Sequence, residues 1–292
     1  MKRSILKHVA ALVLVAGLAA CGSPPQPVPD AYKKAFEFNR KGEAAYKRGD
    51  FAKALVLYND ALQTNLSMED FDGMAINLGN LAAVYRTMGD RAGALGCVDV
   101  ILNAPAGQYG KEMLSDAAYL KAVLSADARD YKEAGIWADK ALAYCGGTGC
   151  PSAGGAFNLK ARLAIKAGNY ASAIAYGDEA LKINDKAKDG PEKANSLRLI
   201  GEAHVRQGRP VEARRYYDRA LALDKRLGLG SKVAADLTGI GDALYALKDY
   251  GGARSYFERA VRVCEGGGFL EPGKTASGMA LKCEEAMKKG ER

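Results

Sequence analysis

The feature that most constrains this chain is a segment that it repeats about every forty residues. Residues 47–62 read KRGDFAKALVLYNDAL, residues 206–221 read RQGRPVEARRYYDRAL and residues 246–261 read ALKDYGGARSYFERAV. An alanine recurs at steps of 40, 40, 39, 40 and 40 residues, at Ala54, Ala94, Ala134, Ala173, Ala213 and Ala253. A second small residue keeps the same steps, at Gly42, Ala82, Ala122, Ala161, Gly201 and Gly241. Two series with one period through six copies indicate a repeat protein.

Each copy has the pattern of two helices joined by a short turn. In the second helix, Ala54, Tyr58 and Ala61 follow the spacing i, i+4, i+7, which places them on one helical face. Glycines suited to a left-handed helix end stand in the turns, at Gly49, Gly89, Gly168 and Gly208. Residues that can cap the following helix stand in the turns too, at Asp50, Asp90, Asp130, Asn169 and Asp249. No alternating strand pattern is present, so we predict an all-α fold.

A small residue before the turn, Gly-Asp-aromatic in it, and alanine, aromatic and alanine after it resemble the tetratricopeptide repeat. The spacing of about forty residues is similar to its longer variety, and the stretch NLGNLAAVYRTMGDRAGAL (77–95) is especially close. The resemblance covers about residues 35–265. It implies a right-handed α-solenoid of about six helix-turn-helix repeats.

The predicted array occupies residues 31–271. A final amphipathic segment, within residues 272–292, is expected to form a C-terminal capping helix from about Lys274. Copies three and four depart from the pattern because Ala138 and Gly177 replace the aromatic residue. We therefore expect looser packing in these two copies.

The start of the chain has the pattern of an export signal. A basic head, MKRSILKH, precedes an apolar run of residues 9–20, which is too short for a membrane span of about 20 residues. The segment LAACG (18–22) resembles the box at which bacterial lipoprotein signals are cut. The resemblance implies that residues 1–20 are a signal peptide and that Cys21 carries the lipid, including palmitate. An ordinary cleaved signal with a chance cysteine is the alternative.

The residues after this box are expected to tether the folded body to a membrane. Residues 21–30 contain the Pro-rich stretch GSPPQPVPD, which favours an extended chain. In lipoproteins, a residue other than Asp after the cysteine implies the outer membrane, and here that residue is Gly22. The formal net charge of +8 includes three positive residues of the signal, which leaves +5 for the rest. This mild basic bias in an exported protein does not favour nucleic acid as a partner.

Five cysteines remain after Cys21, and an envelope location permits disulfides. Cys145 and Cys150 flank a short Gly-rich loop. A second bridge, from Cys264 in the last repeat to Cys283 in the cap, would join the cap to the array. Cys97 would then be an unpaired thiol. Connectivity does not follow from sequence alone. The spacings do not suit a zinc site.

A phosphate-loop motif and the histidines are candidate signs of catalysis, and neither indicates an active site. GFLEPGKT (268–275) matches the phosphate-binding loop G-x-x-x-x-G-K-T, but that loop must follow a buried strand and open a helix. Here it follows a repeat helix, so we interpret it as a connector before the cap. The only histidines are His8, in the signal, and His204, at a packing position of the repeat. We predict no catalytic residue, no metal site and no cofactor.

The resemblance also implies where partners bind, because the first helices of tetratricopeptide repeats line a concave groove for peptides or partner helices. Carried over by spacing, the predicted groove residues are Asn39, Tyr46, Arg86, Tyr119, Asn158, Arg162, Arg198, Glu202 and Tyr245. Tyr and Arg are residue types that anchor protein interfaces. Asn39 and Glu43 differ from the Lys and Asn of family members that clamp a terminal carboxylate, so binding of chaperone tails is not expected.

We therefore predict a non-enzymatic, lipid-anchored scaffold that faces the periplasm and binds protein or peptide partners. Assembly of an envelope complex, such as pilus, secretion or cell-wall machinery, is the expected role. Two alternatives stay open: a nucleotide-binding enzyme that uses residues 268–275, and a carrier whose groove holds a small molecule or lipid. The partner, the oligomeric state and the binding face do not follow from the sequence.

Overall fold

The computed structural model describes residues 29–146 and 149–290, which contain thirteen α-helices and no strand. The helices are α2 (Asp30–Lys47), α3 (Phe51–Leu66), α4 (Phe71–Met88), α5 (Arg91–Leu102), α6 (Lys111–Asp127), α7 (Tyr131–Tyr144), α8 (Ser152–Lys166), α9 (Tyr170–Lys186), α10 (Gly190–Arg206), α11 (Pro210–Leu227), α12 (Gly230–Ala246), α13 (Tyr250–Gly267) and α14 (Leu270–Lys288). The predicted all-α class is confirmed. The predicted signal peptide, Cys21 and most of the tether lie outside the described residues.

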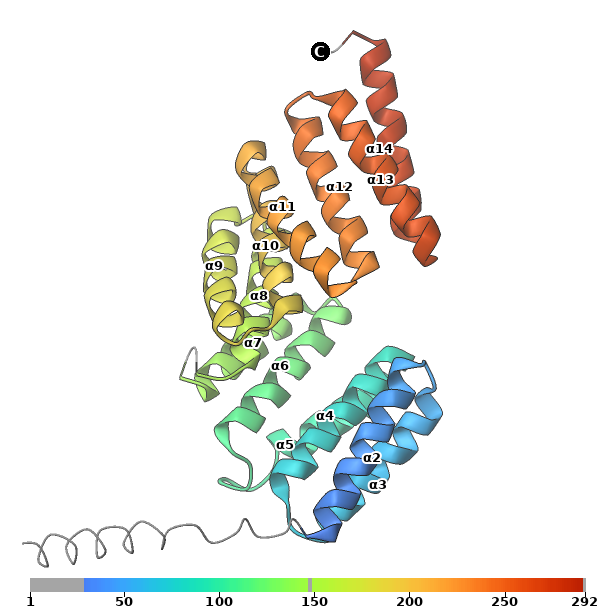
Figure 1. Cartoon of the computed structure of the whole chain (residues 1–292). Coiled ribbons are helices and arrows are strands. Elements are labelled where there is room, and N and C mark those ends of the chain that lie inside the picture. Colours follow the sequence, from blue (N-terminus) through green and yellow to red (C-terminus); the bar gives the residue numbers. More distant parts are fainter. Residues whose placement is uncertain (1–28, 147–148, 291–292) are drawn as a thin grey trace, which may run out of the picture.

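Helices α2 to α13 form six consecutive pairs, and α14 packs on the last pair (Figure 1). We call α2, α4, α6, α8, α10 and α12 the first helices of the repeats and their partners the second helices. Every second helix packs between its own first helix and the helix that follows it. In Figure 1 the pairs follow an arc with α7, α8 and α9 at its middle. Because each pair buries its apolar face against its neighbours, clusters of buried residues that span adjacent repeats follow one another along the array. The predicted solenoid with a C-terminal cap is confirmed.

The turns inside the repeats have the predicted chemistry. Each of the five predicted caps accepts a hydrogen bond from the backbone N–H three residues later, as Asp50 does from Lys53. The four predicted turn glycines all have positive φ. In repeats three and six the same left-handed position is held by Arg129 (φ 62°) and Lys248 (φ 64°), where a side chain is strained. The turn geometry is therefore kept even where its glycine is missing.

In repeats one, two, five and six, two residues of matched size fill the crossing of the two helices. In repeats one, five and six, a glycine of the first helix lies against an aromatic ring of the second. A Cβ added to Gly241 would lie 2.6 Å from the ring of Phe257, so this glycine is required for the close approach. In repeat two the pair is Ala82 with Val98, both buried. A larger residue on the second helix is thus paired with a smaller residue on the first, so that the pair fills the crossing.

The looser packing expected in repeats three and four is wrong at the two positions that suggested it. Ala138 is fully buried and packs in one cluster with Leu159 of the next repeat. At Gly177, a Cβ would lie 2.5 Å from Cγ1 of Ile200. The space left by each missing aromatic ring is therefore filled by an aliphatic side chain from the following repeat.

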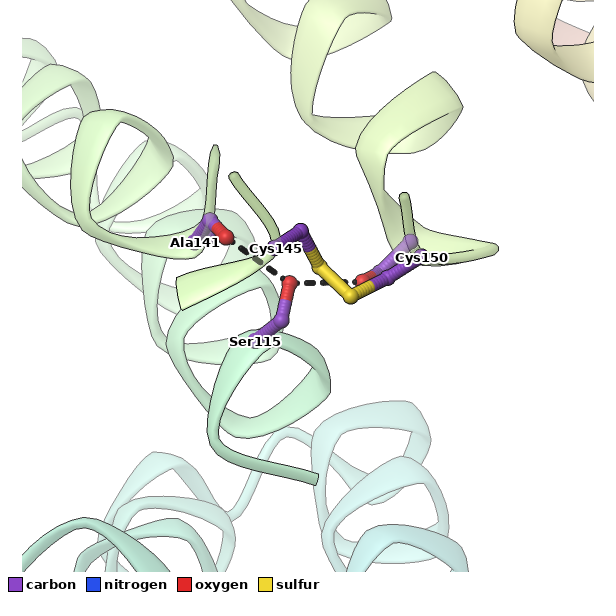
Figure 2. Close-up of a disulfide and its surroundings, with 5 residues drawn as sticks. Ser115, Ala141, Cys145 and Cys150 are labelled. Carbon is purple, nitrogen blue, oxygen red and sulfur yellow. Dashed lines mark hydrogen bonds between the residues drawn. A yellow bond between two sulfur atoms is a disulfide. The ribbon is translucent and has the colours of Figure 1, made fainter. Parts of the chain in front are cut away.

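The turn between α7 and α8 contains a disulfide between Cys145 and Cys150, one of the two predicted pairs (Figure 2). Their Cα atoms are 5.4 Å apart, in the usual range for a disulfide. Beside it, the hydroxyl of Ser115 donates to the carbonyl of Ala141 (2.9 Å) and lies 2.9 Å from the hydroxyl of Ser152. Helix α6 is thereby bonded to both sides of the disulfide-closed turn.

The predicted bridge between Cys264 and Cys283 is wrong. Both are buried thiols, and with Cys97 they are the free cysteines of the described residues. Helices α13 and α14 run in opposite directions, and the position of Gly273 faces Cys264. Cys283 lies ten residues further along α14, about 15 Å away at 1.5 Å per residue. The two thiols therefore belong to opposite ends of the helix pair.

Candidate functional site

The candidate site is the surface along the first helices, which we call the first-helix face. Neighbouring first helices contact one another from α4 to α12, while the second helices pack behind them. The nine predicted groove residues fall at three equivalent repeat positions of this face. They are Asn39, Tyr119, Asn158 and Arg198 at the first position, Arg162 and Glu202 at the second, and Tyr46, Arg86 and Tyr245 at the third.

Some of these side chains bond one first helix to the next. Asn80 donates to Oδ1 of Asn39 at 3.3 Å, and the hydroxyls of Tyr46 and Thr87 lie 2.8 Å apart. Arg86 forms an ion pair with Asp127 of α6. Every one of these contacts joins residues 41 apart in sequence. Asn39, Tyr46 and Arg86 therefore also fix the spacing of the first three repeats.

Two further predicted groove residues are mainly structural. Asn158 is only 2% exposed, and its Nδ2 donates to the Oε2 of Glu192 at 2.7 Å. The ring of Tyr119 fills the space beside Gly155, and burial raises the pKa of Tyr119 to about 12. Asn158 is therefore not free for a partner, which corrects its assignment as a binding residue. Tyr119 is half-buried and stays a predicted binding residue.

Arg198 is also committed to the fold. Its guanidinium forms ion pairs with Asp224 of α11 and Asp236 of α12, and the Nε–Oδ1 distance to Asp236 is 2.7 Å. The two carboxylates are 1% and 0% exposed, and the Arg198 side chain is 16% exposed. Burial raises the pKa of Asp236 to about 7, although the guanidinium opposes this shift. One arginine thus forms ion pairs with two buried aspartates and connects α10, α11 and α12.

The remaining predicted groove residues, Arg162, Glu202 and Tyr245, are accessible to a partner. A pocket of about 610 Å³, called here the α10–α14 pocket, lies between α10, α12 and α14. Glu202, Arg206, Asp242 and Tyr245 line it. Burial raises the pKa of Asp242 to about 6 against the opposing charge of Arg206. Arg162 lies outside this pocket, is exposed and forms no ion pair with another described residue. These side chains offer both charges and an aromatic ring.

A second pocket on the same face was not predicted from the sequence. This α4–α6 pocket has a volume of about 400 Å³ and lies between α4, α5 and α6. Its lining is mostly apolar and includes Ile76, Met113 and Leu120. One sequence signal was available: Ile76 occupies the same repeat position as Phe36, and both are exposed, at 57% and 66%. Apolar residues at an exposed repeat position favour a binding surface.

Solved structures with a similar arrangement of helices are known. The apo form of RapI has a TM-score of 0.66 at 12% identity, over 87% of this chain and 72% of that one. A Rap protein complexed with competence and sporulation factor has a TM-score of 0.60 at 13% identity, over 88% and 75%. PilW, a widely conserved type IV pilus biogenesis factor, has a TM-score of 0.58 at 17% identity, over 82% and 97%. At these identities the similarity is one of fold.

The sequence matches the family model of the tetratricopeptide repeat over residues 152–226 and 192–266. These ranges contain repeats four to six, and repeats one to three have the same spacing, turns and helix packing. The chain is a tetratricopeptide-repeat protein. No curated protein matches its sequence.

In this tetratricopeptide array the phosphate-loop motif lies in a helix. Helix α14 begins at Leu270, so the segment interpreted as a connector is largely the first turns of the cap, a correction to the predicted start at Lys274. The ammonium of Lys274 pairs with Glu271 at 2.8 Å, and the Thr275 hydroxyl donates to the carbonyl of the same glutamate. The preceding element is α13, not a strand. The described residues thus lack the strand–loop–helix context of a nucleotide site.

His204 has the surroundings of a packing residue. It is buried in α10, and its ring stacks on Tyr216 of α11 with centroids 5.4 Å apart. Burial lowers the pKa of His204, which favours the neutral ring. Within residues 29–146 and 149–290, no group of three or more His, Cys, Asp or Glu side chains is arranged to hold a metal ion. In the same part of the chain, none of the helices combines the length and apolar character needed to cross a membrane.

Proposed function

We propose that this tetratricopeptide-repeat protein is a lipid-anchored scaffold that faces the periplasm and binds a protein partner through its first-helix face. The fold is that of a protein–protein interaction scaffold. The observation that carries the proposal is the α10–α14 pocket, where charged and aromatic side chains from successive helices stand together on a face that repeat packing leaves uncovered. Such mixtures of Arg, Tyr and carboxylates are suited to anchoring a protein segment.

The membrane anchor is supported by the sequence before the array. The basic head, the apolar run and the LAACG box precede a Pro-rich segment that ends where α2 begins, at Asp30. Lipid at Cys21 would hold the array beside the membrane, with Gly22 favouring the outer membrane. The disulfide between Cys145 and Cys150 suits an oxidising compartment such as the periplasm.

An assembly role in the envelope is the finer part of the proposal. PilW, which has a similar fold, is a type IV pilus biogenesis factor, and a Rap protein of similar fold is complexed with competence and sporulation factor. The Rap complex supports partner recognition by this fold, and PilW supports a role in building an envelope structure. For this chain, the candidates are pilus, secretion and cell-wall machinery.

Crosslinking and capture from native envelopes tests the proposal. We expect wild type to retain a defined set of proteins and Glu202→Lys, in the α10–α14 pocket, to lose most of it. Glu179→Lys is the matched control because Glu179 carries the same charge on second helix α9, where it pairs with Lys182. Both variants must melt like wild type. A Cys21→Ala variant is expected to leave the membrane fraction. Equal capture by both charge variants would contradict binding at this face.

The nucleotide-binding alternative has a direct test as well. Nucleotide binding that Lys274→Ala abolishes would support an enzyme and argue against the scaffold. We expect no such binding, because Lys274 pairs within the first turns of α14.

A further inference from the structure

Gly79 occupies a position where repeat packing does not require a glycine. It lies in the interior of α4, where glycine weakens a helix. Gly42 and Gly241 make room for aromatic rings, but a Cβ added to Gly79 would have no atom within 4 Å. In the other five repeats the equivalent residues all carry side chains: Asn39, Tyr119, Asn158, Arg198 and Thr238.

The absent side chain leaves the α4–α6 pocket open. Gly79 lines this pocket together with Val98 and Ile101 of α5 and Met113 and Leu120 of α6. A volume of about 400 Å³ has room for a large aliphatic or aromatic side chain. Met113 adds an unbranched thioether that adapts to the shape of what it contacts. The pocket therefore suits one apolar side chain better than a polar one.

The lining of the pocket also carries a negative charge. Glu112 and Asp116 line it on the α6 side, and neither forms an ion pair with a described cation. Asp116 is exposed at the pocket rim, where partial desolvation raises its pKa, so a cation brought beside it would favour its charged form. Asp116 stands at the repeat position that holds apolar Phe36 and Ile76 in the two preceding repeats. An apolar pocket next to two unpaired carboxylates is complementary to an apolar residue beside a basic one.

We infer that the α4–α6 pocket receives an apolar side chain from a basic segment of a partner protein. This inference rests on the proposed function, since it names the kind of segment that the first-helix face recognises. It concerns a different pocket from the one that carries the proposed function, in the other half of the array.

The experiment uses the purified chain with ¹³C-methyl methionine and follows the Met113 methyl signal by NMR, assigned with a Met113→Leu variant. The probe is a glycine/serine peptide with one leucine between two lysines, titrated to roughly millimolar concentration. We expect a saturable shift of the Met113 signal. Replacing the peptide's leucine by alanine should weaken binding roughly 10- to 100-fold, and replacing its lysines by glutamate should weaken it further.

Gly79→Leu is the decisive variant because its side chain would occupy the pocket from the pocket's own wall, and an added Cβ there meets no atom within 4 Å. This variant should raise the stability of α4 and yet abolish the peptide-induced shift of the Met113 signal. If Gly79 had only a structural role, these two effects would not occur together. Gly96→Leu is the matched control, since Gly96 is an exposed glycine of α5 with no atom within 4 Å of an added Cβ. It should gain similar stability and keep binding.

In the peptide titration, any of four results would overturn the inference: no saturable shift, equal binding of the alanine peptide, equal binding of the glutamate peptide, or binding retained by Gly79→Leu. A shift caused by 1-hexanol but not by the peptide would make the pocket a small-molecule site and would equally overturn it. Loss of envelope capture in Glu202→Lys but not in Gly79→Leu would leave the proposed function intact while removing this inference.

Discussion

Replacing Arg198 by alanine is expected to lower the free energy of unfolding by about 3–5 kcal/mol. The reason is that Asp224 and Asp236 are almost fully buried and share this one guanidinium. Without it, two carboxylates would remain in the interior with no opposite charge beside them. Chemical denaturation at neutral pH measures the loss.

Arg162→Ala is the matched control, because Arg162 occupies the first-helix face but is exposed and has no ion-pair partner among the described residues. Its effect should stay within about 0.5 kcal/mol. Equal effects of the two variants would show that the buried aspartates do not depend on Arg198. A charge reversal at Arg198 is for the same reason unsuitable as a probe of partner binding.

The same cluster predicts a pH dependence of stability. Because burial raises the pKa of Asp236 to about 7, the folded protein holds this proton more tightly than the unfolded chain does. The contribution of Asp236 to the free energy of unfolding is therefore largest below about pH 4 and is lost as the pH rises through 7. Asp236→Asn should flatten the stability profile between about pH 4 and 7. An unchanged profile would contradict the shift.

Phe257→Ala is expected to cost about 3–5 kcal/mol of stability, since Phe257 is fully buried and its ring fills the space above Gly241. Gly241→Ala should also destabilise, by about 1–3 kcal/mol, because its Cβ would meet that ring. Combining Gly241→Ala with Phe257→Val recreates the Ala82–Val98 pair of repeat two. The effects of Gly241→Ala and Phe257→Val, measured singly, give the sum expected for independent changes. We expect the double variant to be more stable than this sum predicts, by about 0.5–3 kcal/mol.

Leu270→Ala is the control for this series, because Leu270 is also a large apolar residue but is 75% exposed. Its effect should stay within about 0.5 kcal/mol. Strict additivity of the Gly241 and Phe257 changes would contradict the view that the two crossing residues of this repeat are matched in size.

The repeat and its turns could be predicted because they depend on local chemistry. A small residue at a helix crossing, a left-handed turn residue and a capping side chain each act within one helical pair, so the period makes them visible. Loss of the aromatic at Gly177 was misleading because the compensation comes from Ile200, in the next repeat. Such compensation between repeats has no signature in the local pattern.

The candidate site was less predictable, because its side chains are defined by contacts between repeats. Arg198 looks like a groove residue by spacing, but its partners Asp224 and Asp236 lie 26 and 38 residues further along and meet it only when three helices pack. Asn158 meets Glu192 in the same way. The α4–α6 pocket depends on an absent side chain at Gly79, which in a sequence looks like any other small residue.

The measurement that tests the central claim most directly is site-specific photocrosslinking in cells. A photoreactive residue would replace exposed side chains of the first helices, namely Phe36, Ile76, Arg162 and Arg206. The matched positions on the second helices are Val56, Val100, Ile136 and Val211, all exposed apolar residues. We predict adducts with a partner protein from the first set and none from the second. Adducts formed mainly from the second set would contradict binding at the first-helix face.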